Sequence, residues 1–244
     1  MRLQFVGSGD AFGSGGRFNT CFHVTADATR FLIDCGASSM VALRRCGLDL
    51  NAIETVFVSH LHGDHFGGLP FFIVDAQLVS KRTAPLTIAG PPGLRQRLAD
   101  AMENFLPGST KVARKFAVDI VELEPDRPAT VNGVAVTPFL VQHVCGAPPF
   151  ALRLAVDGKV VAYTGDTEWT DALVPAGRDA DLFVAEAYFY DKPIKYHLDV
   201  KTLLAHVGEI RPKRLILTHM SPDMLARPAP EGCTKADDGM IVEF

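Results

Sequence analysis

Hydrophobic positions follow two spacings along the chain, and together they predict a mixture of strands and helices. Short apolar runs bounded by Gly, Pro or Asp predict strands at 2–6, 20–25, 30–34, 55–59, 85–89, 116–123, 134–142, 150–156, 159–164, 182–186 and 214–218. Apolar residues at helical spacing predict helices at about 36–45, 67–79, 94–105 and 200–208. Asn51 is a candidate cap for a short helix, and Asp199 is a candidate cap for the last helix.

The same pattern predicts a single domain over residues 1–244. No internal repeat, low-complexity segment or linker rich in Pro, Gly or Ser divides the chain. Both halves mix strands with helices, so we expect two similar halves packed together. With 48% hydrophobic residues, the chain can bury a sizeable core.

Charge and composition narrow the function. The formal net charge of −4 argues against a general nucleic-acid binder, because such domains carry a basic excess. No apolar stretch reaches the roughly 18 residues of a membrane span, and the opening MRLQFVGSGDAF does not read as a signal peptide. The five scattered cysteines form no C-x-x-C pair and are typical of free thiols in a reducing compartment. We therefore expect a cytoplasmic protein without a membrane partner.

A cluster of potential metal ligands directly follows the strand at 55–59. Residues 59–68 read Ser-His-Leu-His-Gly-Asp-His-Phe-Gly-Gly, so His60, His62, Asp64 and His65 fall within six positions. The glycines let the backbone turn until these side chains converge. Imidazole together with carboxylate suits zinc, manganese or iron. The cluster therefore predicts a metal site.

One loop cannot supply all the ligands of two metals, so further ligands should stand elsewhere. His143 follows the strand at 134–142, Asp166 follows the strand at 159–164, and His219 follows the strand at 214–218. Rigid strands followed by loops are where functional side chains gather. We therefore expect these three residues to complete the site.

With these residues in place, the sequence resembles the metallo-β-lactamase superfamily, especially the branch of ribonuclease Z and related phosphodiesterases. The resemblance rests on the H-x-H-x-D-H motif with the later His, Asp and His. It extends to Gly7-Ser8-Gly9, Asn19-Thr20-Cys21, Leu32-Ile33-Asp34-Cys35-Gly36, Gly90-Pro91-Pro92-Gly93-Leu94 and Thr164-Gly165-Asp166-Thr167. It implies an α+β fold, the four-layered αββα sandwich.

The resemblance also implies a role for each ligand. His60, His62 and His143 would hold one metal, Asp64, His65 and His219 the other, and Asp166 would bridge the two. A bridging water or hydroxide would be the nucleophile, and Asp34 would orient a ligand histidine. Two divalent ions are implied; zinc suits the ligands best, while manganese and iron are compatible.

A second pair of residues is implied to act on the substrate. By the resemblance, His197 would protonate the leaving oxygen or stabilise the transition state, and Glu186 would orient it. A histidine can do this at neutral pH, and an alkoxide leaving group needs a proton. Together with Asp64, these residues form our expected catalytic set.

The chain departs from ribonuclease Z between His143 and Asp166. Residues 144–165 suffice only for a two-stranded hairpin, so the long arm that grips transfer RNA in that family is absent. The cysteine-rich insertion of the phosphonate-pathway cyclic phosphodiesterases is absent too. We therefore expect a small, even cyclic, phosphodiester as substrate and not transfer RNA, and a homodimer is compatible with the sequence.

Three alternatives remain open at this point. The same scaffold supports hydrolysis of lactones, thioesters or sulfate esters. It also supports RNA cleavage of the ribonuclease Z kind, or a non-catalytic metal-binding role. The pair Glu186 and His197 favours the phosphodiester, and the complete ligand set argues against the non-catalytic role.

Overall fold

The computed structural model describes residues 1–244, whose strands form two seven-stranded sheets. The first sheet has the order β14-β1-β2-β3-β4-β5-β6. Its strands are β1 (Arg2–Gly7), β2 (Cys21–Thr25), β3 (Arg30–Ile33), β4 (Thr55–Phe57), β5 (Leu86–Gly90), β6 (Val118–Glu122) and β14 (Ile241–Glu243). Neighbours from β14 to β3 pair antiparallel, and those from β3 to β6 pair parallel.

The second sheet takes the remaining strands in the order β13-β12-β11-β10-β9-β8-β7. They are β7 (Ala129–Val131), β8 (Val134–Leu140), β9 (Phe150–Val156), β10 (Lys159–Tyr163), β11 (Leu182–Glu186), β12 (Leu215–Thr218) and β13 (Cys233–Lys235). Strands β10 to β13 pair parallel, whereas β7 to β10 pair antiparallel. Each half of the chain thus builds one sheet, except that β14 returns to the first.

The two sheets pack face to face over an apolar core. Phe5, Phe22 and Phe57 project from the first sheet and pack with Phe150 and Tyr163 of the second, all fully buried. The rings of Phe22 and Tyr163 meet edge to face, with centroids 5.1 Å apart. This core holds the two sheets, and every loop that leaves them, in fixed relative positions.

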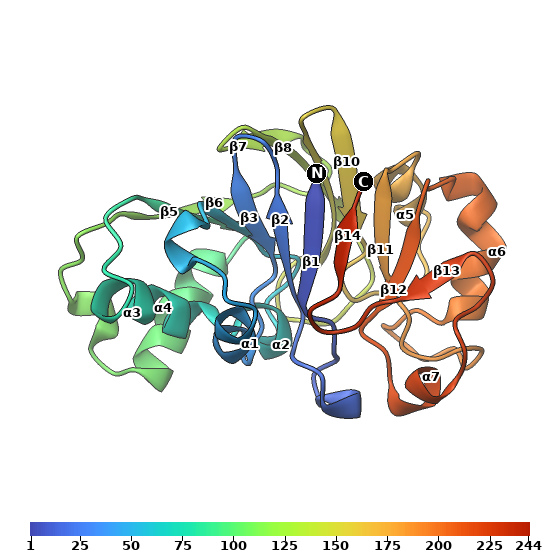
Figure 1. The fold of residues 1–244 in the computed structure, drawn as a ribbon, viewed down its shortest axis with the longest axis horizontal. Helices are drawn as coiled ribbons and strands as arrows, with labels where there is room; N and C mark the ends of the chain where they lie inside the picture. Colours follow the sequence, from blue (N-terminus) through green and yellow to red (C-terminus); the bar gives the residue numbers. More distant parts are fainter.

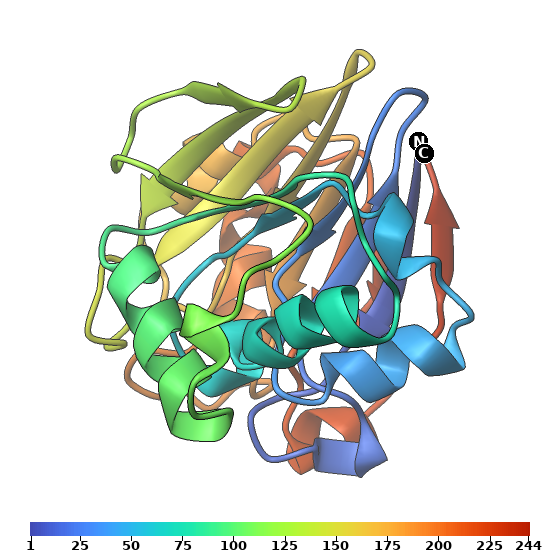
Figure 2. The same cartoon turned by 90° about the vertical axis from the view of Figure 1, so that its left-hand side faces the viewer.

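Helices cover the outer face of each sheet. Helices α1 (Ser39–Arg45), α3 (Leu69–Leu78) and α4 (Leu94–Phe105) share a core with the first sheet. Helices α5 (Leu173–Gly177), α6 (Val200–Ile210) and α7 (Pro222–Ala226) share one with the second. Figures 1 and 2 show the resulting layers, helix–sheet–sheet–helix. The αββα sandwich implied by the resemblance is therefore confirmed.

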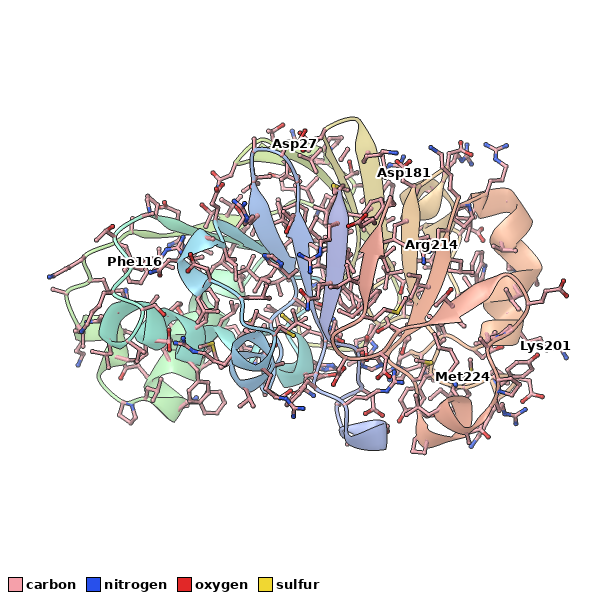
Figure 3. All side chains as sticks on the ribbon, viewed as in Figure 1. Asp27, Phe116, Asp181, Lys201, Arg214 and Met224 are labelled. Carbon is pink, nitrogen blue, oxygen red and sulfur yellow. The ribbon has the colours of Figure 1, made fainter.

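The two ends of the sandwich differ. At one end, hairpin turns of the two sheets contact each other. The backbone amide of Asp27, in a turn of the first sheet, donates to the Asp157 carboxylate of the second at 2.7 Å. In Figure 3, Asp27 and Asp181 mark this upper end, and Met224 of α7 lies at the lower end. The lower end also carries α1 and the one-turn helix α2 (Gly63–Phe66), which falls within the histidine cluster.

Most predicted elements are confirmed, with errors at the short ones. The helix at 94–105 and the strands at 150–156 and 182–186 have the expected bounds, and Asp199 caps α6. The prediction that Asn51 caps a helix is wrong: Asp49 is the cap, and its carboxylate accepts from the Asn51 amide. Helices α2, α5 and α7 and strands β7, β13 and β14 were not predicted, because three to five residues carry too little periodicity.

No helix has the length and apolar character needed to cross a bilayer. The five cysteines are all free thiols, as predicted.

His23, on β2, is buried and lies outside the histidine cluster. It should make the fold sensitive to acid. Burial, reinforced by Arg2 and Arg30, lowers its pKa to about 4. The folded state therefore resists a proton that the unfolded chain accepts at about pH 6.5, so stability is lost as the pH falls through this window. Compared with His23→Gln, the native chain should lose roughly 2–3 kcal/mol more between about pH 7 and pH 4.5 in urea unfolding.

The control is Thr130→Ser, at an exposed position of β7 that carries no titratable group, and it should leave this pH dependence unchanged. If the free energy of unfolding changes with pH in the same way for the native chain and for His23→Gln, this role of His23 is ruled out.

Candidate metal centre

The histidine cluster is held between the ends of β3 and β4. After β4 the chain passes Ser59, enters the cluster and folds into α2. The amide of Cys35 donates to the His65 carbonyl at 2.6 Å. A Cβ added to Gly36 would lie 2.1 Å from the Asp64 carbonyl oxygen. Only glycine lets the backbone after β3 approach the cluster this closely.

Asp34, at the end of β3, orients one histidine of the cluster. Its carboxylate accepts bonds from the amide and the hydroxyl of Ser59, each at 2.7 Å, and from Nδ1 of His65 at 2.7 Å. Burial raises the pKa of this carboxyl, although His65 and Ser59 favour its charged form. Because Nδ1 is engaged, Nε2 of His65 is left to face the site.

The three later candidates meet the cluster from the second sheet. His143 follows β8, Asp166 follows β10 and His219 follows β12, and all three line one cavity with residues of the cluster. His219 adopts a left-handed conformation, with φ 56°, and so does Asp34, with φ 59°. Such backbone costs about 1–2 kcal/mol per residue and is tolerated where the surroundings enforce it.

Three histidines form the first group of potential ligands. His60, His62 and His143 each place a ring nitrogen within 4.8 Å of the other two. Nδ1 of His62 is 3.1 Å from Nε2 of His143, near the roughly 3.3 Å expected for two nitrogens on one tetrahedral zinc. Nδ1 of His143 lies 2.9 Å from the carbonyl of Tyr196, which fixes the ring.

The second group combines two carboxylates with two histidines. Nε2 of His65 lies 3.2 Å from Asp64 and 3.3 Å from Asp166, and Nε2 of His219 is at the same two distances from these carboxylates. Asp166 is also 3.9 Å from Nε2 of His60. Asp166 therefore lies between the two groups.

The donor atoms of both groups fit divalent metal ions. Nε2 of His60, Nε2 of His65 and Oδ1 of Asp166 are buried without a hydrogen-bond partner. Such atoms are costly to bury unless a charge or a ligand satisfies them. Burial, with the charge of His65, lowers the pKa of His60, which favours the neutral ring that binds metals. The burial of so many donors in one place indicates a site for divalent metal ions.

Glu186 and His197 form a pair beside this centre. Glu186, at the end of β11, is fully buried and accepts a hydrogen bond from the Thr167 amide at 2.8 Å. Its Oε1 contacts Nδ1 of His197 and lies 3.6 Å from Nδ1 of His219. Burial alone would lower the pKa of His197, but the hydrogen bond to Glu186 and the charges of Glu186 and Asp166 together outweigh burial and raise that pKa.

A cavity of about 300 Å³ opens onto both groups and onto His197. Its lining includes ligand candidates from both sheets, together with Ala11, Phe12 and Tyr188. A neighbouring cavity of about 630 Å³ shares His62 and Gly63 with it and extends along α4 past Arg97 and Asn104. The centre is thus reachable by a small molecule from outside.

The structure therefore brings together every site residue named from the sequence, and it adds several. Phe12, Tyr188 and the Tyr196 carbonyl were not singled out. Tyr188 is two residues beyond Glu186, so a reading of the residues around that carboxylate could have found it. Nothing in the sequence marks a backbone carbonyl as a partner of His143.

Fold and site together define a metal-dependent hydrolase of the metallo-β-lactamase superfamily, in the ribonuclease Z-like branch. The chain belongs to the family described as Anti-Pycsar protein Apyc1, whose model matches residues 1–235.

Individual relatives agree with this placement. The chain is 25% identical to a ribonuclease Z of Methanosarcina acetivorans, over 91% of this chain and 88% of that protein. It is 28% identical to a ribonuclease Z of Halorubrum lacusprofundi, over 100% and 97%. The crystal structure of human tRNase Z, short form, superposes with a TM-score of 0.81 at 26% identity, covering 100% of this chain and 99% of that one. Zn²⁺-bound PqqB from Methylobacterium extorquens (TM-score 0.75, 16% identity, 100% of both chains) shares the fold.

The carboxylate of Asp34 should strengthen metal binding through His65. In Asp34→Asn, the neutral amide leaves His65 less basic and less firmly oriented, and we expect metal affinity to fall roughly 10–100-fold. Titration of the metal-free protein against a competing chelator measures this change. Asn tolerates the left-handed backbone at this position, so the fold should persist.

Asp119→Asn, on exposed β6, is the matched control and should bind metal like the native chain. Unchanged affinity in Asp34→Asn would show that the bond to His65 contributes only to the fold.

Proposed function

We propose that this chain is a dinuclear metal phosphodiesterase that cleaves a small phosphodiester, with residues 1–244 acting as one hydrolase domain. The observation that carries the proposal is the pair of His197 and Glu186 facing the same cavity as the ligand candidates. Hydrolysis of a phosphodiester expels a poor leaving group, so a proton donor beside the metals matches this reaction.

In this proposal, the two groups of donors hold two divalent ions. His60, His62 and His143 would hold one, Asp64, His65 and His219 would hold the other, and Asp166 lies between the two groups. Zinc suits this set of nitrogen and carboxylate donors, and manganese or iron are compatible. Bound divalent ions lower the pKa of water from 15.7 to about 7 and offset negative charge on phosphoryl oxygens.

The protein's own contribution is to hold a proton at the leaving oxygen. Glu186 binds Nδ1 of His197, which leaves Nε2 to carry the proton toward the cavity. The hydrogen bond to Glu186 and the charges of Glu186 and Asp166 raise the pKa of His197, which favours the protonated ring that can donate to a leaving group. Because Glu186 also lies beside His219, it fixes the acid relative to the metal ligands.

The dimensions of the site favour a small substrate. The cavity of about 300 Å³ at the centre suits a phosphodiester group, and the neighbouring 630 Å³ can receive an organic substituent. Strands β9 and β10 form a plain hairpin between His143 and Asp166. This interval has no extended arm that could reach a large RNA.

Cleavage of RNA is the second candidate, and the relatives support it. The curated relatives are named ribonuclease Z, and the human structure is of a tRNase Z. These names weigh against our expectation that transfer RNA is not a partner. The alignment to the Halorubrum protein spans 302 positions, more than the 244 residues of this chain, so that relative carries additional segments. The bond cleaved would be the same in both candidates.

Replacing His197 tests the proton donor. For His197→Ala we expect kcat to fall about 10²–10⁴-fold on a dinucleoside monophosphate, whose leaving group is an alkoxide. The loss on bis(p-nitrophenyl) phosphate should be at least tenfold smaller, because nitrophenolate leaves without a proton. Steady-state kinetics of the metal-loaded protein measures both. Equal losses on the two substrates would refute the general-acid role.

His206→Ala, at a half-buried position of α6 that does not line the cavity, is the matched control and should behave as the native chain. A screen of the native protein on a precursor transfer RNA, a lactone, a thioester and a sulfate ester separates the remaining candidates. Faster turnover of the precursor RNA than of every small phosphodiester would establish the second candidate in place of the first.

A further inference from the structure

Phe12 is the most exposed large apolar side chain of the protein, and it stands at the entrance to the metal cavity. Its side chain is 84% exposed, above every other large hydrophobic residue. It nevertheless lines the cavity that also contains His197 and the ligand candidates. The ring is not held by packing in the core, and its place in the cavity lining makes it available to a molecule that enters.

The turn that carries Phe12 is firmly held, although the ring is not. Asp10 is fully buried, and its carboxylate accepts from the amide of Phe12 at 3.2 Å, the amide of Ser14 at 2.9 Å and the Ser14 hydroxyl at 2.6 Å. Asn19 donates its side-chain amide to the Asp10 carbonyl at 3.0 Å. These hydrogen bonds hold the backbone of the turn in place. The turn therefore fixes the position of Phe12 at the cavity.

The segment beyond the turn is braced against the second half of the chain. Gly15 lies so near Leu225 of α7 that an added Cβ would be 2.8 Å from its methyl group. Figures 1 and 2 show the short helix at Ser14–Gly16 beside α7. Loop and helix thus fix Phe12 relative to the ligand His219, which precedes α7 in the chain.

Tyr188 also lines the cavity, beside the reacting groups. Its ring is 5.0 Å from that of His197 and 6.2 Å from that of His219. Both Phe12 and Tyr188 line the cavity with His197, so it has aromatic surface as well as metal-binding donors. An exposed ring of this kind is suited to stack on another flat ring.

We propose that Phe12 is a specificity residue that stacks on a flat ring of the substrate. The inference rests on the proposed function and narrows it to phosphodiesters that carry an aromatic group, either a nucleobase or an aryl ring. Stacking between a side chain and a base strengthens binding roughly 5- to 100-fold and tolerates any ring, because every such ring has a π face.

Calorimetric binding to the metal-loaded protein tests this independently of catalysis. The probes are phenylphosphonate and methylphosphonate, with adenosine 5′-monophosphate and ribose 5-phosphate as a second pair. In Phe12→Ala, affinity for the ring-bearing probes should fall roughly 5- to 100-fold, and affinity for methylphosphonate and ribose 5-phosphate should stay within about twofold. Phe12→Tyr should restore the native affinity.

Phe71→Ala is the matched control, since Phe71 is also exposed, at 41%, and lines neither cavity. A loss with both ring-bearing probes supports a general ring subsite, and a loss with adenosine 5′-monophosphate alone supports a nucleobase subsite. Equal effects of Phe12→Ala on probes with and without a ring, or no effect, would overturn the inference. Failure of the native chain to hydrolyse any phosphodiester would instead refute the proposed function. The binding comparison between the native chain and Phe12→Ala would still show whether Phe12 stacks on a ring.

Discussion

The packing of the two sheets determines the geometry of the whole site. The cluster at residues 60–65 follows β4 of the first sheet, while His143, Asp166 and His219 follow strands of the second. Neither sheet alone presents a complete set of donors. The shared apolar core, including the contact between Phe22 and Tyr163, therefore sets the distances on which any metal binding depends. Stability and function are coupled through this interface.

The charges at the site pose a second constraint. His60, His65, Asp166 and Glu186 are all buried, and several of their donor atoms have no hydrogen-bond partner. Buried polar atoms of this kind would destabilise the fold if nothing compensated them. Divalent ions would compensate them, so we regard the fold and its metals as a single thermodynamic unit.

The candidate ligands could be named from the sequence because their signals are local. Three histidines within six residues, and single ligands directly after apolar strands, can be recognised without coordinates. The αββα order followed from the resemblance, and the long helices and buried strands followed from periodicity. The ligand motif, the long helices and the buried strands all depend on residues that are near one another along the chain.

The features that escaped prediction depend on residues distant along the chain. The left-handed backbone of Asp34 and His219 is enforced by contacts between segments. The conformational propensities of these residue types do not predict it. Glu186 was expected to orient His197, but its additional approach to His219 was not, because it requires β11 and β12 to be paired. The return of β14 to the first sheet and the position of Phe12 at the cavity have the same origin. Sequence indicated which residues to examine, and only the packing showed how they act together.

The proposed chemistry depends on two metal ions bound between the sheets. Elemental analysis of the protein after loading with zinc and exhaustive dialysis tests this directly. We expect about two metal ions per chain, together with hydrolysis of bis(p-nitrophenyl) phosphate that is lost on chelation and recovered on adding metal. Fewer than about one metal per chain, with no hydrolysis in zinc or manganese, would contradict the account.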